Sequence, residues 1–135
     1  MSDRPEAPVV LCCVGDGTTQ QGEFLEAVAE AVRTHAPVVF LIEDNRYAIS
    51  TRTPGNTVFD LPQGPASELF GIPIARVNGA DLAATRNAFE TAVGRTRHER
   101  TPTIVVLDLE RLSDHTNADD QDIYRTPEEI ADGRS

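Results

Sequence analysis

The sequence predicts an α/β protein with three layers, in which helices cover both faces of a parallel β-sheet. Two observations lead to this fold class. Short runs of apolar and β-branched residues alternate with segments whose apolar residues recur at helical spacing. The runs are apolar at consecutive positions, which is typical of strands buried on both faces, as they are in parallel sheets. With 135 residues, of which 39% are hydrophobic, the chain has room for one domain.

Four apolar runs are predicted to be strands: residues 8–14, 37–43, 72–77 and 101–109. Three segments are predicted to be helices: residues 24–35, residues 82 to about 97, and a short stretch that begins near Pro127. Asp81 could cap the second helix, because its carboxylate can accept a hydrogen bond from an amide of the first turn. Residues 54–65 contain several Pro and Gly residues and are predicted to form turns. The polar segment 111–126 is predicted to be a mobile loop.

The charge balance excludes some classes of partner. Twelve basic and twenty-two acidic side chains give a formal net charge of −10, which repels nucleic acid phosphates and anionic lipid surfaces. No stretch approaches the ~20 apolar residues of a membrane span, and the first residues lack the pattern of a secretory signal peptide. We therefore expect a cytoplasmic protein that binds neither nucleic acid nor membrane. Cys12 and Cys13 are neighbours in an apolar run and are predicted to be reduced packing residues on opposite faces of a strand.

Residues 14–24 read VGDGTTQQGEF, so a carboxylate lies between two glycines where the first predicted strand ends. Asp16-Gly17 could form a tight hairpin, but that turn would need a second strand directly afterwards, and a helix is predicted there instead. The triplet from Gly15 to Gly17 then lies at the carboxyl edge of the sheet, where open α/β sheets bind ligands. Its backbone amides could approach a phosphate, and Asp16 could hold a metal ion in front of it. A phosphate site and a structural turn both stay open on these residues alone.

A second polar group follows the next predicted strand. Asn45 lies 29 residues after Asp16 (45 − 16 = 29), an interval that one β-α-β unit fills. Adjacent parallel strands end about 5 Å apart, so a carboxylate oxygen and an amide oxygen could reach one ion. Oxygen ligands without His or Cys suit magnesium, which commonly takes further ligands from substrate phosphates. Asn45 could equally cap a turn through its own backbone.

These two segments carry a family resemblance. GDGTTQQGEFLEAVAEAV followed by PVVFLIEDNRYAIS resembles the thiamine diphosphate motif, which consists of a GDG triplet, an interval of this length and a paired asparagine. In detail, the chain resembles the alpha subunit of the decarboxylating dehydrogenase component of 2-oxo acid dehydrogenase complexes, the group that covers pyruvate, branched-chain and acetoin substrates. RLSDHTNADDQDIYRTPEEI likewise resembles the phosphorylation loop of that family. The resemblance extends from about Val9 to Ala131, and it implies the thiamine diphosphate-binding fold for residues 1–135 as one domain.

The resemblance also implies a set of site residues. Asp16 and Asn45 would coordinate magnesium through their side chains and Tyr47 through its backbone carbonyl, and the metal would bind the diphosphate of thiamine diphosphate. Arg111 and His115 match loop residues that reach the diphosphate and the mouth of the active site, and His115 is the catalytic candidate. The remaining cofactor-binding positions are the two glycines of the triplet, Gly15 and Gly17.

Reaction and partners follow from the same resemblance. Family members decarboxylate a small 2-oxo acid oxidatively and transfer the acyl group to a lipoyl-bearing acyltransferase. In relatives, the glutamate that activates the cofactor comes from a beta-type subunit. We therefore expect this chain to be inactive alone and to work with a beta-type dehydrogenase subunit, in relatives as a heterotetramer. Thr116 occupies the position of a regulatory serine.

The sequence also departs from the family pattern. Asp44 replaces the first asparagine of the usual pair, and Asp114 replaces the usual glycine or histidine before His115. If these carboxylates face the cofactor, each would weaken diphosphate binding by about 1 kcal/mol. The long amino-terminal portion of the family is expected to be missing. These departures motivate a second hypothesis, a noncatalytic assembly or regulatory domain that keeps the fold without the cofactor site. A third is a magnesium-binding phosphotransfer domain of receiver type, based only on acids at strand ends.

Overall fold

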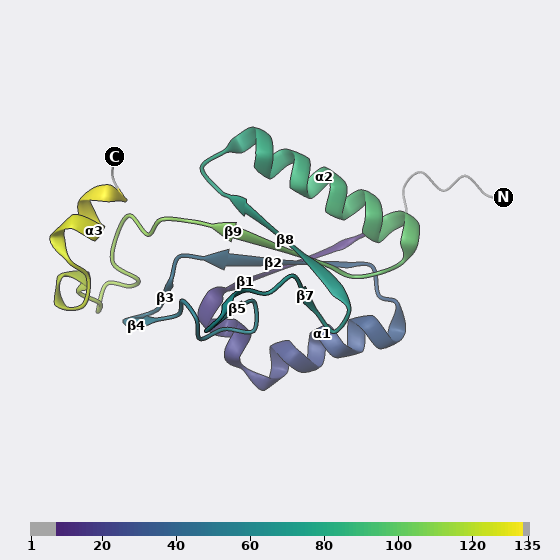
Figure 1. Ribbon diagram of the computed structural model, residues 1–135, viewed down its shortest axis with the longest axis horizontal. Coiled ribbons are helices and arrows are strands. Elements are labelled where there is room, and N and C mark those ends of the chain that lie inside the picture. The colour runs from purple at the N-terminus through teal and green to yellow at the C-terminus, as the bar shows by residue number, and fades with distance from the viewer. Residues whose placement is uncertain (1–7, 134–135) are drawn as a thin grey trace.

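The computed structural model describes residues 8–133, and its centre is a five-stranded sheet with the strand order β1-β2-β9-β8-β7. Four of these strands are parallel to one another: β1 (Val10–Gly15), β2 (Val38–Asp44), β8 (Ile72–Asn78) and β9 (Thr103–Asp108). Figure 1 shows α1 (Gly22–Thr34) on one face of this sheet and α2 (Leu82–Glu99) on the other. The predicted three-layer α/β architecture is confirmed.

Both long helices follow from local sequence signals. The buried positions of α1, which are Phe24, Val28 and Ala31, recur at the spacing of one helical face. α2 begins after Asp81 as expected, since the Asp81 carboxylate accepts a hydrogen bond from the Ala84 amide (2.9 Å). The helix predicted near Pro127 is also present, as α3 (Pro127–Asp132).

β2 separates two apolar clusters, because successive side chains of a strand point to opposite faces of the sheet. Phe40 lies in the cluster under α1 and meets Phe24 edge-to-face, with 5.9 Å between the ring centroids. Val39 and Leu41 lie in the other cluster, together with Ala92 of α2. Burying one large apolar side chain contributes about 1.5–3 kcal/mol, so these clusters hold both helices against the sheet.

The sheet is not parallel throughout, because β7 (Glu68–Leu69) pairs antiparallel with β8 at one edge. A two-residue turn joins them, and both of its residues, Phe70 and Gly71, have positive φ (50° and 78°). Such a turn matches the twist of a hairpin but normally contains Asn-Gly or Gly-Gly. The sequence did not predict this antiparallel edge strand, because Phe70-Gly71 does not carry the usual turn signal.

The covering of the sheet is incomplete at β1, which corrects the prediction that the strands are buried on both faces. α2 packs on β9, β8 and β2, whereas Val10 and Leu11 of β1 are 57% and 53% exposed. Leu11 shares the face of Val39, its register partner, so α2 does not extend far enough to cover it. Cys13 is exposed as well, and the prediction that both cysteines are packing residues holds for Cys12 alone.

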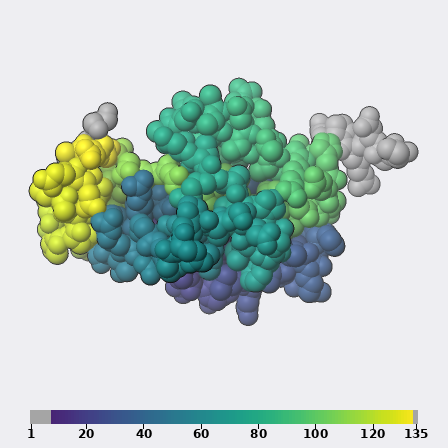
Figure 2. All heavy atoms as spheres, in the orientation of Figure 1, coloured from purple at the N-terminus to yellow at the C-terminus, as the bar shows by residue number. Residues whose placement is uncertain are grey.

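Short elements surround the carboxyl ends of the parallel strands. Between β2 and β8 the chain forms two small hairpins: β3 (Tyr47–Ala48) with β4 (Thr51–Arg52), and β5 (Asp60–Leu61) with β6 (Gly64–Pro65). The C-terminal segment, with the 3₁₀ helix η2 (Gln121–Ile123) and α3, lies at this end of the sheet. Figure 2 shows it (yellow) against the residues that follow β2 (blue). Within residues 8–133, no helix is long and apolar enough to cross a membrane.

Candidate diphosphate and metal site

Asp16 is the first residue after β1 and begins the 3₁₀ helix η1 (Asp16–Gln20), so no hairpin forms at the GDG triplet. The residue is only 2% exposed, and Thr53 Oγ1 donates a hydrogen bond to its Oδ2 (2.5 Å). Thr19 Oγ1 donates to the backbone carbonyl of Asp16 (2.6 Å). These bonds fix the carboxylate at the strand end, and Oδ1 is the oxygen with which it could bind a cation.

Gly17 allows η1 to lie very close to the segment after β2. A Cβ atom at position 17 would lie 2.5 Å from Ala48 Cβ, which is shorter than real Cβ contacts. At Gly15, by contrast, an added Cβ would meet no heavy atom within 4 Å beyond its chain neighbours. Gly15 is also extended (φ −77°), a conformation open to any residue. The steric need for glycine in the triplet is therefore at position 17.

Asn45 follows β2 and forms a turn with its own backbone, as one of the two interpretations predicted. Asn45 Oδ1 accepts a hydrogen bond from the Tyr47 amide (3.1 Å), and the intervening Arg46 is left-handed (φ 68°). An amide oxygen has two lone pairs, so the same atom can also bind an ion. The turn and a metal site are thus compatible functions of Asn45.

The ends of β1 and β2 open into one cavity of about 310 Å³. Its lining combines the GDG triplet and the residues after it, the turn after β2 and one residue of the C-terminal loop: Gly15, Asp16, Gly17, Thr18, Gln21, Asn45, Tyr47, Ala48, Ile49 and His115. Six of the seven predicted site residues therefore face one space, although three separate segments supply them. Asp16 and Asn45, the pair on which the magnesium prediction depends, are both among them.

The donor atoms around this cavity suit a hard cation. The Asp16 carboxylate and the Asn45 side-chain amide provide oxygen ligands of the kind that magnesium prefers, as a backbone carbonyl such as that of Tyr47 also can. Across residues 8–133, no group of three or more His, Cys, Asp or Glu side chains could hold a metal. A magnesium ion here would therefore take its remaining ligands from a diphosphate and from water, which is usual for this ion.

Arg111 is the predicted site residue that does not line the cavity. Its Nη1 donates to the carbonyl of Ile49 (2.8 Å) and its Nη2 to the Tyr124 hydroxyl (2.7 Å). The guanidinium also lies over the rings of Tyr47 and Tyr124, 5.2 and 5.4 Å from their centroids. Because Ile49 and Tyr47 line the cavity, Arg111 is one layer of residues away from it.

The loop that carries His115 is held by Asp119 and Tyr124. Asp119 Oδ2 accepts hydrogen bonds from the His115 amide (2.8 Å) and from the Tyr124 hydroxyl (2.6 Å). The hydrogen bond from Tyr124 lowers the pKa of Asp119, and burial raises the pKa of Tyr124. These contacts define one arrangement in which His115 reaches the cavity, while the mobility expected for segment 111–126 stays a prediction.

Asp44 and Asp114 do not line the cavity, although the Asp44 carboxylate is close enough to that of Asp16 to be repelled by it. Asp44 is buried; its Oδ1 accepts from the Arg46 amide (3.0 Å) and its Oδ2 from Arg76 Nη1 (3.3 Å). Burial raises the pKa of Asp44. Asp114 Oδ1 accepts from the Gln121 amide (2.9 Å).

Sequence reasoning did not identify three residues that bond to predicted site residues or to a neighbour of one, which are Thr53, Arg76 and Tyr124. Thr53 lies at the edge of the turn-rich stretch, where no local motif marks it as the partner of a distant carboxylate. Arg76 lies in a strand predicted only from its apolar residues. Tyr124 could have been found, because it lies in the loop segment that matches the family.

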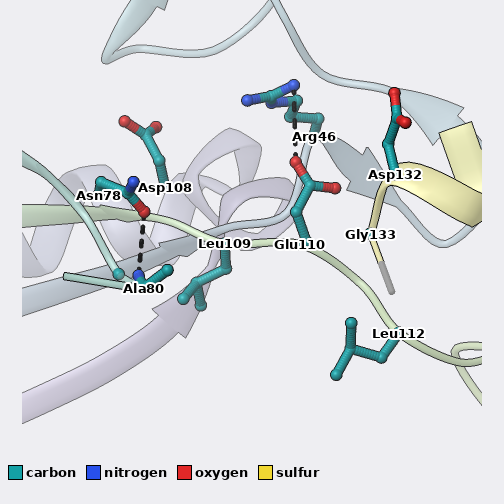
Figure 3. Close-up of a pocket in the computed structure, with 10 residues that line it drawn as sticks. Arg46, Asn78, Ala80, Asp108, Leu109, Glu110, Leu112, Asp132 and Gly133 are labelled. Atoms are coloured by element: carbon teal, nitrogen blue, oxygen red, sulfur yellow. Dashed lines mark hydrogen bonds and ion pairs between the residues drawn. The ribbon is translucent and has the colours of Figure 1, made fainter. Parts of the chain in front are cut away.

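A second and larger hollow, of about 620 Å³, lies at the carboxyl ends of β8 and β9. Figure 3 shows Asn78 and Asp108 on one side of it, Asp132 on the other, and Arg46 with Glu110 between them. Arg46 and Glu110 form an ion pair in its wall (3.8 Å). None of the predicted site residues lines this hollow, so it is distinct from the diphosphate candidate.

These observations define the class of protein. It is an α/β protein with a candidate cofactor site at the carboxyl edge of its parallel strands, where the GDG triplet and the Asn45 turn line one cavity. Residues 3–135 match the family model described as Dehydrogenase E1 component, and the chain belongs to this family. The predicted family resemblance is thereby confirmed.

Named relatives agree with this membership. The chain is 40% identical over 129 residues to the "Pyruvate dehydrogenase E1 component subunit alpha" of Acholeplasma laidlawii. The aligned region covers 93% of this chain and 36% of that protein. The protein of the same name from Mycoplasma genitalium is 38% identical over 131 residues, or 96% of this chain and 36% of the relative. That from Staphylococcus aureus (strain Mu50) is 34% identical over 133 residues, or 98% and 36%. The chain thus spans 36% of the length of these relatives.

Proposed function

We propose that this chain is the magnesium- and thiamine diphosphate-binding half of a 2-oxo acid dehydrogenase active site. The observation that carries the proposal is the single cavity shared by Asp16, Asn45, Tyr47 and His115. Membership of the dehydrogenase E1 family supports it, as do relatives named pyruvate dehydrogenase E1 component subunit alpha. The residues at the cavity fit the cofactor, since they combine hard oxygen donors with a closely packed glycine.

Asp16, Asn45 and the Tyr47 carbonyl would hold the metal ion in this proposal. A metal is required because a chain with a net charge of −10 and a carboxylate at the cavity would otherwise repel a diphosphate. Thr53 keeps the Asp16 carboxylate in place, and the close contact of Gly17 with Ala48 keeps the two ligand-bearing segments together.

Bound thiamine diphosphate would supply the nucleophilic carbanion and the electron sink for decarboxylation of a small 2-oxo acid. His115 is the catalytic candidate of this chain, because it lies at the cavity where it could exchange a hydrogen bond or a proton with an oxygen of the substrate. Its backbone is fixed by Asp119. Arg111 would reach the diphosphate only if its guanidinium turned away from Ile49 and Tyr124.

Turnover would require other chains. We infer a beta-type dehydrogenase subunit as the partner that completes the cavity, in a heterotetramer of the kind that relatives form. A lipoyl-bearing acyltransferase would accept the acyl group. The cytoplasmic location expected from the sequence belongs to the same proposal.

A noncatalytic assembly or regulatory domain is the second candidate function. The position of Arg111 favours it, since this cation lies outside the cavity and is bonded to Ile49 and Tyr124. The departures at Asp44 and Asp114 give it less support, because both carboxylates accept hydrogen bonds from groups outside the cavity lining and neither lines the cavity. The receiver-type hypothesis receives no support from the family match.

Calorimetry with thiamine diphosphate, with and without magnesium, separates the two candidates. The first predicts magnesium-dependent binding that tightens when the beta-type partner is added, whereas the second predicts partner association alone. Asp16→Asn keeps the shape of the side chain and should abolish the metal dependence. Glu90→Gln, on the exposed surface of α2, removes one negative charge too and should change nothing. Cofactor at a hundred times its Kd should stabilise the fold by about 2.7 kcal/mol, and no stabilisation would refute the proposal.

A further inference from the structure

Three charged side chains meet where β2, β9 and β8 end. Asp44 and Asp108 are the last residues of β2 and β9 and are register partners. Arg76 lies two residues before the end of β8, where its register partner is Val106. Its side chain reaches the two carboxylates, because its Nη1 donates to both Asp44 Oδ2 (3.3 Å) and Asp108 Oδ1 (2.5 Å). One guanidinium nitrogen therefore bridges the ends of two neighbouring strands.

Burial makes this bridge important for Asp44. Its side chain is 7% exposed, compared with 28% for Arg76 and 31% for Asp108. The Arg76 guanidinium also lies over the ring of Phe59, 5.4 Å from the centroid, and Phe59 is 1% exposed. A buried carboxylate that loses its cation is left with an uncompensated charge, which is far more costly than losing an exposed pair.

The position of Asp44 connects the bridge to the candidate cofactor site. Asp44 directly precedes Asn45, and the Arg46 amide bonds to Asp44 as the Tyr47 amide bonds to Asn45. The turn that presents the metal ligands is therefore anchored at its start by Asp44. A carboxylate at this place also lies next to a site that has to accept a diphosphate, so its charge matters as well as its position.

We propose that Arg76 is a positioning residue of the diphosphate site, which acts through Asp44 by offsetting part of the negative charge of Asp44 and Asp108 and by holding the start of the Asn45 turn. This inference rests on the proposed function. It explains how the chain can carry an aspartate at the position where the family pattern has an asparagine. A neutral residue at position 44 would not need the cation, so the effect of losing Arg76 should depend on which residue is at 44.

A double-mutant cycle on magnesium-dependent thiamine diphosphate binding tests this dependence, with the chain in the presence of its beta-type partner. Arg76→Gln should raise the Kd roughly tenfold, the size expected for one uncompensated charge several Å from an anion. Asp44→Asn alone should leave the Kd within about twofold, and the double variant should recover to within about threefold of the unaltered chain. Arg86→Gln is the matched control, because it removes one positive charge from an exposed pair on α2 and should leave the Kd unchanged.

Arg76→Lys keeps the positive charge but not the planar guanidinium, so it should retain most of the affinity for the cofactor. If Arg76→Gln does not fold, the Kd values of the double variant and of Arg76→Lys still test the inference, because both are expected to stay close to that of the unaltered chain. Equal weakening in Arg76→Gln and the double variant would overturn the inference, as would an unchanged Kd in Arg76→Gln. If the unaltered chain does not bind the cofactor with magnesium, the proposed function fails and this inference fails with it. The unaltered chain alone reveals that outcome.

Discussion

Replacing Gly17 by alanine tests the steric argument for the GDG triplet. The added Cβ would lie 2.5 Å from Ala48 Cβ and 3.2 Å from Ala48 Cα, so η1 or β3 has to move. Overpacking of this kind costs about 1–3 kcal/mol. Gly17 is not among the described residues with positive φ, so the cost arises from contact and not from an unfavourable backbone conformation.

Gly15→Ala is the matched control, since it makes the same chemical change two residues earlier. An added Cβ there meets no heavy atom within 4 Å beyond its chain neighbours, and Gly15 is extended (φ −77°). We expect its free energy of unfolding to stay within about 0.5 kcal/mol of the unaltered chain. Gly17→Ala combined with Ala48→Gly should recover part of the loss, because the second change removes the nearest atom.

Urea unfolding followed by circular dichroism measures these differences. At about 1–3 kcal/mol per molar urea, Gly17→Ala should lower the midpoint by roughly 1 M. Its thermal midpoint should fall by about 4 °C for each kcal/mol in a chain of this size. Equal midpoints for Gly17→Ala and Gly15→Ala would refute the argument that close packing against Ala48 requires glycine at position 17.

Three further predictions concern single side chains. Thr53→Val should lower the free energy of unfolding by about 1–3 kcal/mol, because it removes the donor to the buried Asp16 carboxylate, whereas Thr53→Ser should not; urea unfolding distinguishes them. Because the Tyr124 hydroxyl lowers the folded-state pKa of Asp119, this pair should stabilise the fold above pH ~4 and lose that effect as pH falls through the lowered pKa. The thermal midpoint of the unaltered chain should therefore fall more between pH ~7 and pH ~3 than that of Tyr124→Phe, and an equal fall in the two proteins would contradict this. Phe70→Asn should stabilise by about 1 kcal/mol, since Phe70 is left-handed and 53% exposed; an unchanged urea midpoint would argue against strain there.

The predictable part of the fold is the part that local sequence signals determine. The helical spacing of Phe24 and Val28 and the cap at Asp81 depend on residues close in sequence, and both helices are present as expected. The hairpin at Phe70 could not be predicted, because the turn is imposed by the pairing of β7 with β8 on a residue that disfavours positive φ. The exposure of Leu11 depends on how far α2 extends across the sheet, which is a tertiary property.

In the candidate site, too, local sequence motifs predicted some features, whereas others depend on tertiary structure. The motif letters predicted the residues at the two strand ends, and Asp16 and Asn45 do share a cavity. The partner of Asp16 could not be predicted, because Thr53 reaches it only through the path of a turn-rich segment. The orientation of Arg111 depends on competing acceptors, the Ile49 carbonyl and the Tyr124 hydroxyl, which no sequence pattern reveals.

A strongly acidic chain can keep a diphosphate site when its nearby carboxylates accept hydrogen bonds from groups outside the cavity. Asp44 pairs with Arg76, Asp114 accepts a backbone amide and Asp119 accepts the Tyr124 hydroxyl, so Asp16 is the carboxylate that lines the cavity in the described part of the chain. A divalent cation beside one carboxylate keeps one net positive charge for a phosphate, whereas beside two it keeps none. The departures from the family pattern are therefore compatible with cofactor binding, because what matters is where each added charge points and which donor compensates it.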